Sequence, residues 1–241
     1  MSLKILSLNI ERENHIPKVI ALLEKEKPEV IFLQEIHEPD FEMLKKKFGL
    51  NGFFAPMLTY PRQIDGEKIS VKQGNALYTT LPLLKTEFFI YFGKETIPPY
   101  EKYENNGINR VLTVGSVEKG GIKYNVATTH FTWAGGGGVN EEQRRDVKQL
   151  LKLLQLQGEL VLCGDFNAPR GGEIFTALNR HLKDNIPAHI TTTLDPTLHK
   201  AGPLSYVVDY VWSTPQYSVQ KVRVIDGVSD HMAIVAEIEK F

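Results

Sequence analysis

The sequence predicts an α/β protein in which two mixed β-sheets pack face to face and carry helices on their outer surfaces. The first observation is a pair of strand–helix–strand units, one within residues 3–33 and one within 122–164. A helical crossover of this length joins strands that are parallel neighbours in a sheet. The second observation is a hairpin pattern at 110–129, which adds antiparallel strands. Such a mixture buries its apolar faces when two sheets stack between helices.

The first unit begins with a strand at 3–10 that is rich in Leu and Ile. Asn14 is the expected N-cap of the helix that follows. A second strand at 29–33 leads directly to Glu35. Because the two strands are expected to be parallel, Asn9 and Glu35 should lie at the same end of one sheet. This part of the chain is completed by a helix at 39–48, strands at 52–58, 75–80 and 84–92, and polar loops at 60–73 and 93–107.

The second unit connects the hairpin strand at 122–129 to an apolar strand at 160–164. Its helix starts at Asn140, which together with Gln143 resembles a capping box, and Gly158 suits the C-terminal cap. A glycine-rich loop at 131–139 precedes this helix. The remainder is predicted as a helix at 172–180, irregular chain at 182–204, and strands at 206–212, 219–225 and 232–238.

Length and composition indicate one globular domain over residues 1–241. The net charge of −1 gives no general attraction to nucleic acid or to an anionic membrane. Cys163, the single cysteine, lies in the apolar strand and is expected to be a small core residue, which fits a reducing compartment. No signal peptide and no membrane-spanning stretch is evident. We therefore expect a cytoplasmic protein that acts as a monomer.

The strand at 160–164 ends abruptly in Asp165 and Asn167, at the start of turn-forming sequence. Taken alone, these two residues are explained by the preference of Asp and Asn for turns. The same kind of ending recurs, however, at other apolar strands and at the junction 228–231, which makes a purely structural explanation improbable. The polar residues at these ends are Asn9, Glu35, His130, Asp165, Asn167, Asp230 and His231.

Asp209 lies inside the apolar segment 207–211, where an unpaired charge is costly. It is expected to have a histidine as its partner.

This set of residues suits metal-assisted hydrolysis of a phosphoester. Glu35 offers a hard carboxylate and Asn9 can bind a metal ion or its water, while Mg²⁺ leaves other positions to water and phosphate. Asp165 can orient or deprotonate water, and Asn167 and imidazoles can donate to phosphoryl oxygens. The sequence has no Walker loop, no Gly-x-Ser-x-Gly elbow and no His-Glu-x-x-His or Cys-x-x-Cys zinc spacing.

The motifs, taken together and in order, resemble those of the endonuclease/exonuclease/phosphatase superfamily, which has a DNase I-like fold. The resemblance extends from residue 8 to residue 231 and implies a four-layered α/β sandwich with the site at one rim. The matching segments are Leu8-Asn9, Leu33-Gln34-Glu35, Gly74-Asn75-Ala76-Leu77, Thr129-His130, Gly164-Asp165-Phe166-Asn167, Val208-Asp209-Tyr210-Val211 and Ser229-Asp230-His231.

The resemblance also implies roles and a cofactor, Mg²⁺ or Mn²⁺. The implied metal-binding residues are Asn9, Glu35 and Asp230. Asp209 is implied to orient His130, and His130 and His231 to flank the phosphate. The implied catalytic residues are His130, Asp165, Asn167, Asp209 and His231, and the implied phosphate contacts are Asn75, Arg110 and Asn167.

The Thr129-His130 motif resembles DNase I-like, sphingomyelinase-like and tyrosyl-DNA phosphodiesterase-like members more than abasic-site endonucleases. The expected function is hydrolysis of phosphodiester bonds in nucleic acid, DNA or RNA, of the endonuclease, exonuclease or DNA-end-processing type. The alternative is a phosphatase or phosphodiesterase for a small molecule or lipid headgroup, such as an inositol phosphate or sphingomyelin. A non-catalytic binding module is the third reading. The substrate is expected to be selected by three loops, at 59–73, 93–107 and 131–139.

Overall fold

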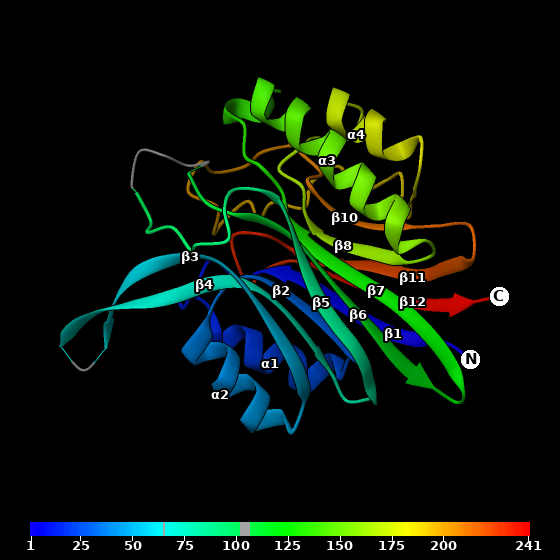
Figure 1. Cartoon of the computed structure of the whole chain (residues 1–241), viewed down its shortest axis with the longest axis horizontal. Helices are drawn as coiled ribbons and strands as arrows, with labels where there is room; N and C mark the ends of the chain where they lie inside the picture. The colour runs from blue at the N-terminus through cyan, green and yellow to red at the C-terminus, as the bar shows by residue number, and fades with distance from the viewer. Residues whose placement is uncertain (65, 102–106) are drawn as a thin grey trace.

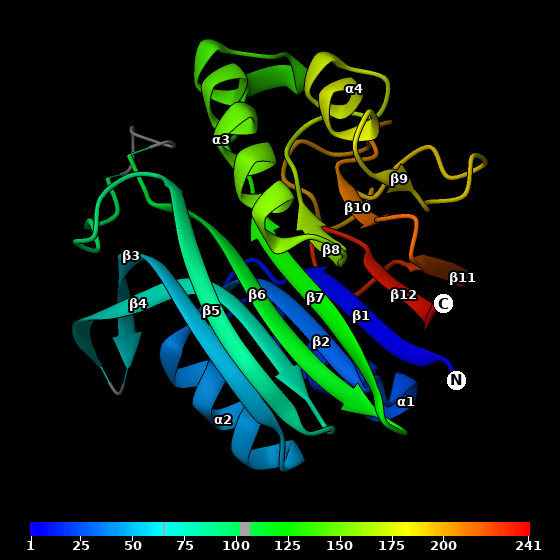
Figure 2. The ribbon, with the colours of Figure 1, turned by 45° about the vertical axis from the view of Figure 1, so that its right-hand side comes forward.

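The computed structural model describes residues 1–64, 66–101 and 107–241, and these residues form two six-stranded mixed sheets between helices. Figures 1 and 2 show α1 and α2 on the outside of one sheet and α3 and α4 on the outside of the other. The arrangement is the predicted α/β sandwich of two sheets flanked by helices. Both chain termini lie together at one end of the sandwich (Figure 1).

The first sheet combines the N-terminal strand–helix–strand unit with the C-terminal strands. β1 and β2 are parallel, and their pairing continues to Asn9, which lies opposite Gln34. In order across the sheet the strands are β11 (Tyr217–Ile225), β12 (Ala233–Lys240), β1 (Leu3–Asn9), β2 (Val30–His37), β4 (Glu67–Thr79) and β3 (Asn51–Ile64). Its outer face is covered by α1 (Ile16–Glu26) and α2 (Glu38–Phe48).

The second sheet contains the central hairpin and the second strand–helix–strand unit. β7 and β8 are parallel, whereas β8 and β10 are antiparallel. The strand order is β5 (Leu83–Phe92), β6 (Arg110–Lys119), β7 (Ile122–His130), β8 (Val161–Asp165), β10 (Asp209–Ser213) and β9 (Lys183–Asp184). The helices on this side are α3 (Glu141–Gln157) and α4 (Glu173–Asn179), and a short 3₁₀ turn, η1 (Gly135–Gly137), precedes α3.

Alternation along the strands separates the residues that face the other sheet from those that face the helices. In β1, Leu3 and Ile5 belong to the central apolar cluster, whereas Leu6 and Leu8 pack with α1. Cys163 is fully buried in the central cluster, as predicted, and this burial raises the pKa of its thiol.

A polar contact joins the two sheets just below the predicted site. Gln34 on β2 donates from Nε2 to Thr128 Oγ1 on β7 at 2.9 Å and to Ser7 Oγ on β1 at 3.3 Å. All three side chains are buried. Because a buried polar group is costly unless it is hydrogen-bonded, this contact favours one relative position of the sheets at the site.

Several sequence-based boundaries require correction. The predicted loop at 60–73 is instead the outer part of a long β3–β4 hairpin, which projects beyond the rest of the sheet (Figure 1). The strand predicted at 206–212 starts only at Asp209. Asn14 does not cap α1, because His15 occupies that position without a side-chain bond. Residue 65 and residues 102–106, which belong to two predicted loops, lie outside the described residues.

The N-cap of α3 is confirmed: the Asn140 side chain accepts a hydrogen bond from Gln143 N at 2.8 Å. Within the described residues, no helix combines the length and the hydropathy needed to cross a bilayer.

Candidate active site

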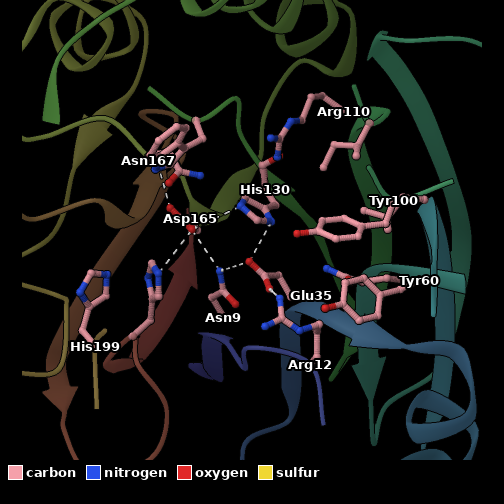
Figure 3. A pocket seen from close by; sticks show the side chains of 15 residues that line it. Asn9, Arg12, Glu35, Tyr60, Tyr100, Arg110, His130, Asp165, Asn167 and His199 are labelled. Carbon is pink, nitrogen blue, oxygen red and sulfur yellow. Dashed lines mark hydrogen bonds and ion pairs between the residues drawn. The ribbon is translucent and has the colours of Figure 1, made fainter. Parts of the chain in front are cut away.

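Polar side chains from both sheets surround one cavity of about 300 Å³ at the end where β1, β2, β7 and β8 terminate (Figure 3). Asn75, Asp209 and Asp230 are not part of its wall among the described residues. The sequence-predicted residues on the wall are Asn9, Glu35, Arg110, His130, Asp165, Asn167 and His231.

Strand register explains why Asp165 has His130 and Asp209 as its neighbours. His130 on β7 and Asp209 on β10 each lie opposite Asp165 on β8. Gly164, immediately before Asp165, has φ of +140°, and a Cβ atom there would lie 2.0 Å from Thr129 O. Only glycine therefore allows the two strands to pair this closely beside the carboxylate.

Asp165 is the centre of the site and is only 1% exposed. Its Oδ1 accepts a hydrogen bond from Asn167 N at 2.8 Å, and its Oδ2 accepts one from Asn9 Nδ2 at 3.1 Å. The same Oδ2 lies 3.5 Å from His130 Nε2 and 3.7 Å from His231 Nε2. Burial raises the pKa of Asp165 although the imidazole of His231 opposes the shift. The carboxylate is therefore a stronger base than an exposed aspartate.

Glu35 is joined to Asp165 through one amide group. Asn9 Nδ2 donates to Glu35 Oε1 at 3.2 Å as well as to Asp165, while Asn9 Oδ1 accepts from Glu11 N at 3.1 Å. Arg12 Nη1 lies 3.4 Å from Glu35 Oε2 (Figure 3). Glu35 has φ of +61°, a conformation that a non-glycine residue adopts at a cost. The backbone is thus strained where this carboxylate enters the cavity.

Asp209 is the partner of His231. Its Oδ2 lies 2.9 Å from His231 Nδ1, and both side chains are buried. Burial alone would lower the pKa of His231, but the charges of Asp209 and Asp165 outweigh it and raise that pKa well above the ordinary value. His231 is therefore an imidazolium at neutral pH.

The prediction that Asp209 orients His130 is wrong. β8 lies between β7 and β10, so two strand spacings, roughly 10 Å, separate His130 from Asp209. His130 instead lies beside Asp165 and 3.9 Å from Glu35 Oε1. Burial lowers the pKa of His130 to about 3, and the nearby Arg110 and His231 also disfavour a second positive charge. The pKa values of His130 and His231 are thus shifted in opposite directions.

Three other predicted residues have contrasting positions. Arg110 is 1% exposed, lines the cavity and donates from Nη1 to His130 O at 3.2 Å, so it is no surface arginine. Asn75 is fully buried in β4, and within the described chain neither its Nδ2 nor its Oδ1 has a hydrogen-bond partner. Asp230 accepts from Ser229 Oγ at 3.0 Å, and burial raises its pKa.

Asn167 is held by the chain that leads into α3. It has φ of +48°, and its Nδ2 donates to Phe131 O at 3.0 Å. Gln143 does not complete a capping box. It reaches away from the helix start and donates from Nε2 to Thr132 O at 2.8 Å and to Asn167 O at 3.0 Å. The first turn of α3 therefore fixes the loop that carries Asn167.

The cavity residues that the sequence did not single out as site residues include Arg12, Tyr60, Tyr100 and His199. His199 Nδ1 accepts from Ala201 N at 3.3 Å, which leaves the proton of a neutral ring on Nε2. None of these residues ends an apolar strand, so the pattern that indicated the others gave no signal. The tyrosines belong to two of the loops expected to select the substrate.

The chemistry of the donors fits a divalent cation on the Glu35 side of the cavity. Glu35 and Asp165 converge on the same amide, and Glu35 has its nearest cation, Arg12, only at 3.4 Å. Carboxylate and amide oxygens are the ligands that Mg²⁺ prefers. Asp165, Asp209 and His231 also have ligand atoms within 4.8 Å of one another. The raised pKa of His231 and its bond to Asp209 make that group a hydrogen-bonded network rather than a cation site.

Comparisons with known proteins agree with this architecture. The model of the "Endonuclease/Exonuclease/phosphatase family" matches residues 6–231. No curated protein matches the chain. A Bacteroides vulgatus endonuclease/exonuclease/phosphatase is 17% identical with a TM-score of 0.75, and the match covers 100% of both chains.

Two further solved structures share the fold. The human nocturnin catalytic domain, solved with a bound sulfate anion, is 19% identical with a TM-score of 0.72, and the match covers 100% of this chain and 94% of that one. TDP2 of D. rerio, solved with a single-strand DNA product, is 18% identical with a TM-score of 0.70, and the match covers 99% of each.

The family model spans nearly the whole chain, and the sandwich is the one that the sequence motifs implied. Enzymes of this family are hydrolases and generally use divalent metal ions. The chain belongs to the endonuclease/exonuclease/phosphatase family.

Proposed function

We propose that the protein is a divalent-metal-dependent phosphoesterase that hydrolyses phosphodiester bonds of nucleic acid, as an endonuclease, an exonuclease or a DNA-end-processing enzyme. The observation that carries the proposal is the environment of Asp165. This buried carboxylate lies between two imidazoles, His130, whose pKa is lowered, and His231, whose pKa is raised, and it shares an amide with the carboxylate of Glu35. A base, a cation and a second carboxylate thus surround one small cavity.

Asp165 is the group we assign to the attacking water. Its Oδ2 faces the cavity, and its raised pKa makes it a better acceptor of a proton than an exposed aspartate. Burial of the carboxylate within a rigid strand end holds it in one position while a water molecule is oriented.

His231 is the group we assign to the phosphoryl oxygens. Its Nδ1 is occupied by Asp209, so Nε2 is the donor on the cavity side. As an imidazolium it stabilises negative charge that grows on the phosphoryl group in the transition state. Neutral His130 and the amide of Asn167 are the additional phosphate contacts, and Arg110 supplies positive charge behind them.

Mg²⁺ or Mn²⁺ would be held by Glu35 and Asn9, with Asp230 close enough for its pKa to respond to the charge of Glu35. When bound, such an ion supplies Lewis-acid stabilisation of the phosphoryl oxygens. Asn9 has one oxygen lone pair already committed to Glu11 N, so its second lone pair would face the ion.

Nucleic acid as substrate is supported by two fold neighbours, one solved with a bound sulfate anion and one solved with a single-strand DNA product. The size of the cavity, about 300 Å³, and the net charge of −1 favour the second candidate, a small phosphate ester or lipid headgroup. Both candidates use the same catalytic residues and differ in what the cavity walls recognise.

The test is a substrate panel for the purified chain in Mg²⁺, Mn²⁺ or EDTA. The panel contains single-stranded and duplex oligonucleotides, bis-p-nitrophenyl phosphate, inositol phosphates and sphingomyelin. We expect metal-dependent cleavage of the oligonucleotides, and its loss in Asp165→Asn. Turnover of only the inositol phosphates or sphingomyelin would select the second candidate, and no turnover of any substrate would refute catalysis by this site.

A further inference from the structure

The cavity has an aromatic side that the catalytic groups do not explain. Tyr60 and Tyr100 lie there with their ring centroids 4.8 Å apart and their planes at 47°. Leu58 and Ile108 line the cavity beside them. We call these four residues the tyrosine wall. Figure 3 shows the two tyrosines across the cavity from Asp165, with both hydroxyl groups directed toward Glu35 and His130.

The tyrosine wall is held by backbone contacts. Thr59 N donates to Pro98 O at 2.8 Å, and Tyr100 N donates to Thr59 O at 2.7 Å. A short parallel bridge between Thr59 and Pro99 results. The segment after β5 is thus docked onto the edge strand β3, so the rings are built into the cavity by main-chain pairing rather than by a chance surface contact.

The two rings differ in what already covers them. The centroid of the Tyr60 ring lies 5.2 Å from the guanidinium carbon of Arg12, 5.4 Å from the His37 ring and 4.8 Å from the Tyr100 ring. Tyr100 has a single ring neighbour among the described residues, which is Tyr60. Neither hydroxyl has a hydrogen-bond partner in the described part of the chain. Tyr100 is half-buried and lines the cavity, so part of its surface is open to a ligand, and Tyr60 supports it.

The charge nearby decides which kind of ligand fits. A pair of tyrosines can hold a quaternary ammonium group such as choline through cation–π attraction. Here the guanidinium of Arg12 already lies over the Tyr60 ring, and Arg110 lines the same cavity. A second cation would be repelled by both. A flat, uncharged ring gains stacking area on Tyr100 without that repulsion.

We propose that the tyrosine wall binds the base of one unpaired nucleotide adjoining the scissile phosphate, with Tyr100 as the stacking partner. The proposal rests on the proposed nuclease function and names its substrate class as single-stranded or unpaired nucleic acid. A cavity of about 300 Å³ is small for a binding site, so one nucleotide unit enters rather than a length of duplex. A base inside a duplex is already stacked and paired, so it must be unstacked before it can reach the ring.

The test compares three 10-nucleotide substrates: a single strand, the same strand in a duplex, and a single strand of abasic residues. We expect the wild-type kcat/KM for the single strand to exceed the other two by roughly tenfold to a hundredfold, the range of one stacked base. Tyr100→Leu should reduce that ratio to near one, whereas Tyr100→Phe, which keeps the ring, should retain it. Phe88→Leu, an exposed aromatic outside the cavity, is the matched control.

A binding measurement tests the proposal independently of the rate at which the oligonucleotides are hydrolysed. In EDTA, fluorescence anisotropy should show tighter binding of the single strand than of the duplex or the abasic strand, with the difference lost in Tyr100→Leu. Equal affinities would overturn the proposal, as would Tyr100→Phe behaving like Tyr100→Leu, because the hydroxyl would then be the recognised group. Faster hydrolysis of p-nitrophenylphosphorylcholine than of the single strand, dependent on Tyr100, would also overturn it. Metal-dependent turnover of the oligonucleotides without base preference refutes this inference alone, whereas failure of the proposed nuclease function means no turnover of any oligonucleotide.

Discussion

Strand β1 connects two clusters of charged side chains, one in which every carboxylate has a cation as its partner and one in which the carboxylates are incompletely paired. At its start, Lys4 N donates to Glu29 Oε2 at 3.0 Å and Lys4 Nζ to Glu26 Oε2 at 2.9 Å. Lys119 pairs with Glu29 at 2.6 Å, and Arg223 pairs with Glu26. Two carboxylates are therefore matched by three cations from the strands β1, β6 and β11, and the cluster ties a helix to strands of both sheets.

At the other end of β1, Asn9 is an amide between the carboxylates of Glu35 and Asp165. Arg12 is the closest cation to Glu35 at 3.4 Å, and His130 has too low a pKa to add a charge. The backbone is also strained here, with positive φ at Glu35 and Arg12. At the Lys4 end of β1 the charges are matched and stabilise the fold. At the Asn9 end the carboxylates are incompletely matched, so this end can bind a cation and a phosphate.

The comparison is tested most strongly at Asp165 and His231. Replacing either with Ala should lower kcat by roughly two to four orders of magnitude, the usual range for acid–base and charge-stabilising groups. KM should change far less. The double variant should lose much less than the product of the two losses, because both groups act in one transition state. Asp226→Ala and His181→Ala, which alter exposed residues, are the controls. A rise in KM alone for His231→Ala would make His231 a binding residue.

Glu35→Gln should act through the metal ion. With the carboxylate charge removed, activity at limiting Mg²⁺ should fall by roughly a hundredfold and recover in part as Mg²⁺ is raised, because Lewis-acid stabilisation of several kcal/mol depends on occupancy. The measurement is kcat against Mg²⁺ concentration, with circular dichroism to show that the fold persists. Glu38→Gln removes a half-exposed carboxylate paired with Lys72 and should leave the curve unchanged. An unaltered metal dependence in Glu35→Gln would exclude Glu35 as the main ligand.

Asp209→Asn should move the alkaline limb of the pH–rate profile. Asp209 helps to raise the pKa of His231, and the charged imidazole is the active form. Without that negative charge the pKa falls, so the imidazolium is lost at a lower pH and the limb should shift down by roughly one pH unit or more. A profile of kcat/KM from pH 5 to 9 measures this shift. The alkaline limb should be absent from the profile of His231→Gln. An unmoved limb in Asp209→Asn would show that His231 is not the titrating group.

The sequence identifies the sandwich and seven of the cavity residues because both depend on strand ends. Asn9, Glu35 and Asp165 follow apolar strands, and the carboxyl ends of parallel strands meet at one edge of a sheet. Which histidine meets Asp209 depends instead on strand order. Because β8 separates β10 from β7, His130 is too distant, and His231 reaches Asp209 from the other sheet.

The β3–β4 hairpin was missed for a related reason. Its outer part pairs as far as Ile64 with Glu67 but projects beyond the core, where residues 66–70 are exposed. A long alternation of apolar and polar residues is therefore missing from this part of the sequence. Tyr60 belongs to this hairpin and reaches the site only because the segment at 98–100 docks beside it. A contact between two segments without apolar periodicity gives no signal in the sequence.

The smallest effect is expected at the other end of β1, where Glu26→Gln should alter stability and leave kcat at neutral pH unchanged. Hydrogen bonds from Arg223 and Lys4 lower the pKa of Glu26 to about 2. A depressed pKa contributes stability that is present above the unfolded value of 4.5 and is lost as pH falls through about 2. The contribution should be roughly 1 to 3 kcal/mol, reduced because Arg223 is half-exposed.

Urea unfolding at pH 7, 4 and 3 measures the free energy of unfolding in the wild type and the variant. The two should differ most at pH 7 and converge toward pH 3, because wild-type Glu26 gains a proton on unfolding only in that range. Glu24→Gln on the same helix removes an exposed carboxylate and should change stability by less than about 0.5 kcal/mol at any pH. A constant difference between wild type and Glu26→Gln at all three pH values would assign the loss to packing rather than to the matched charges.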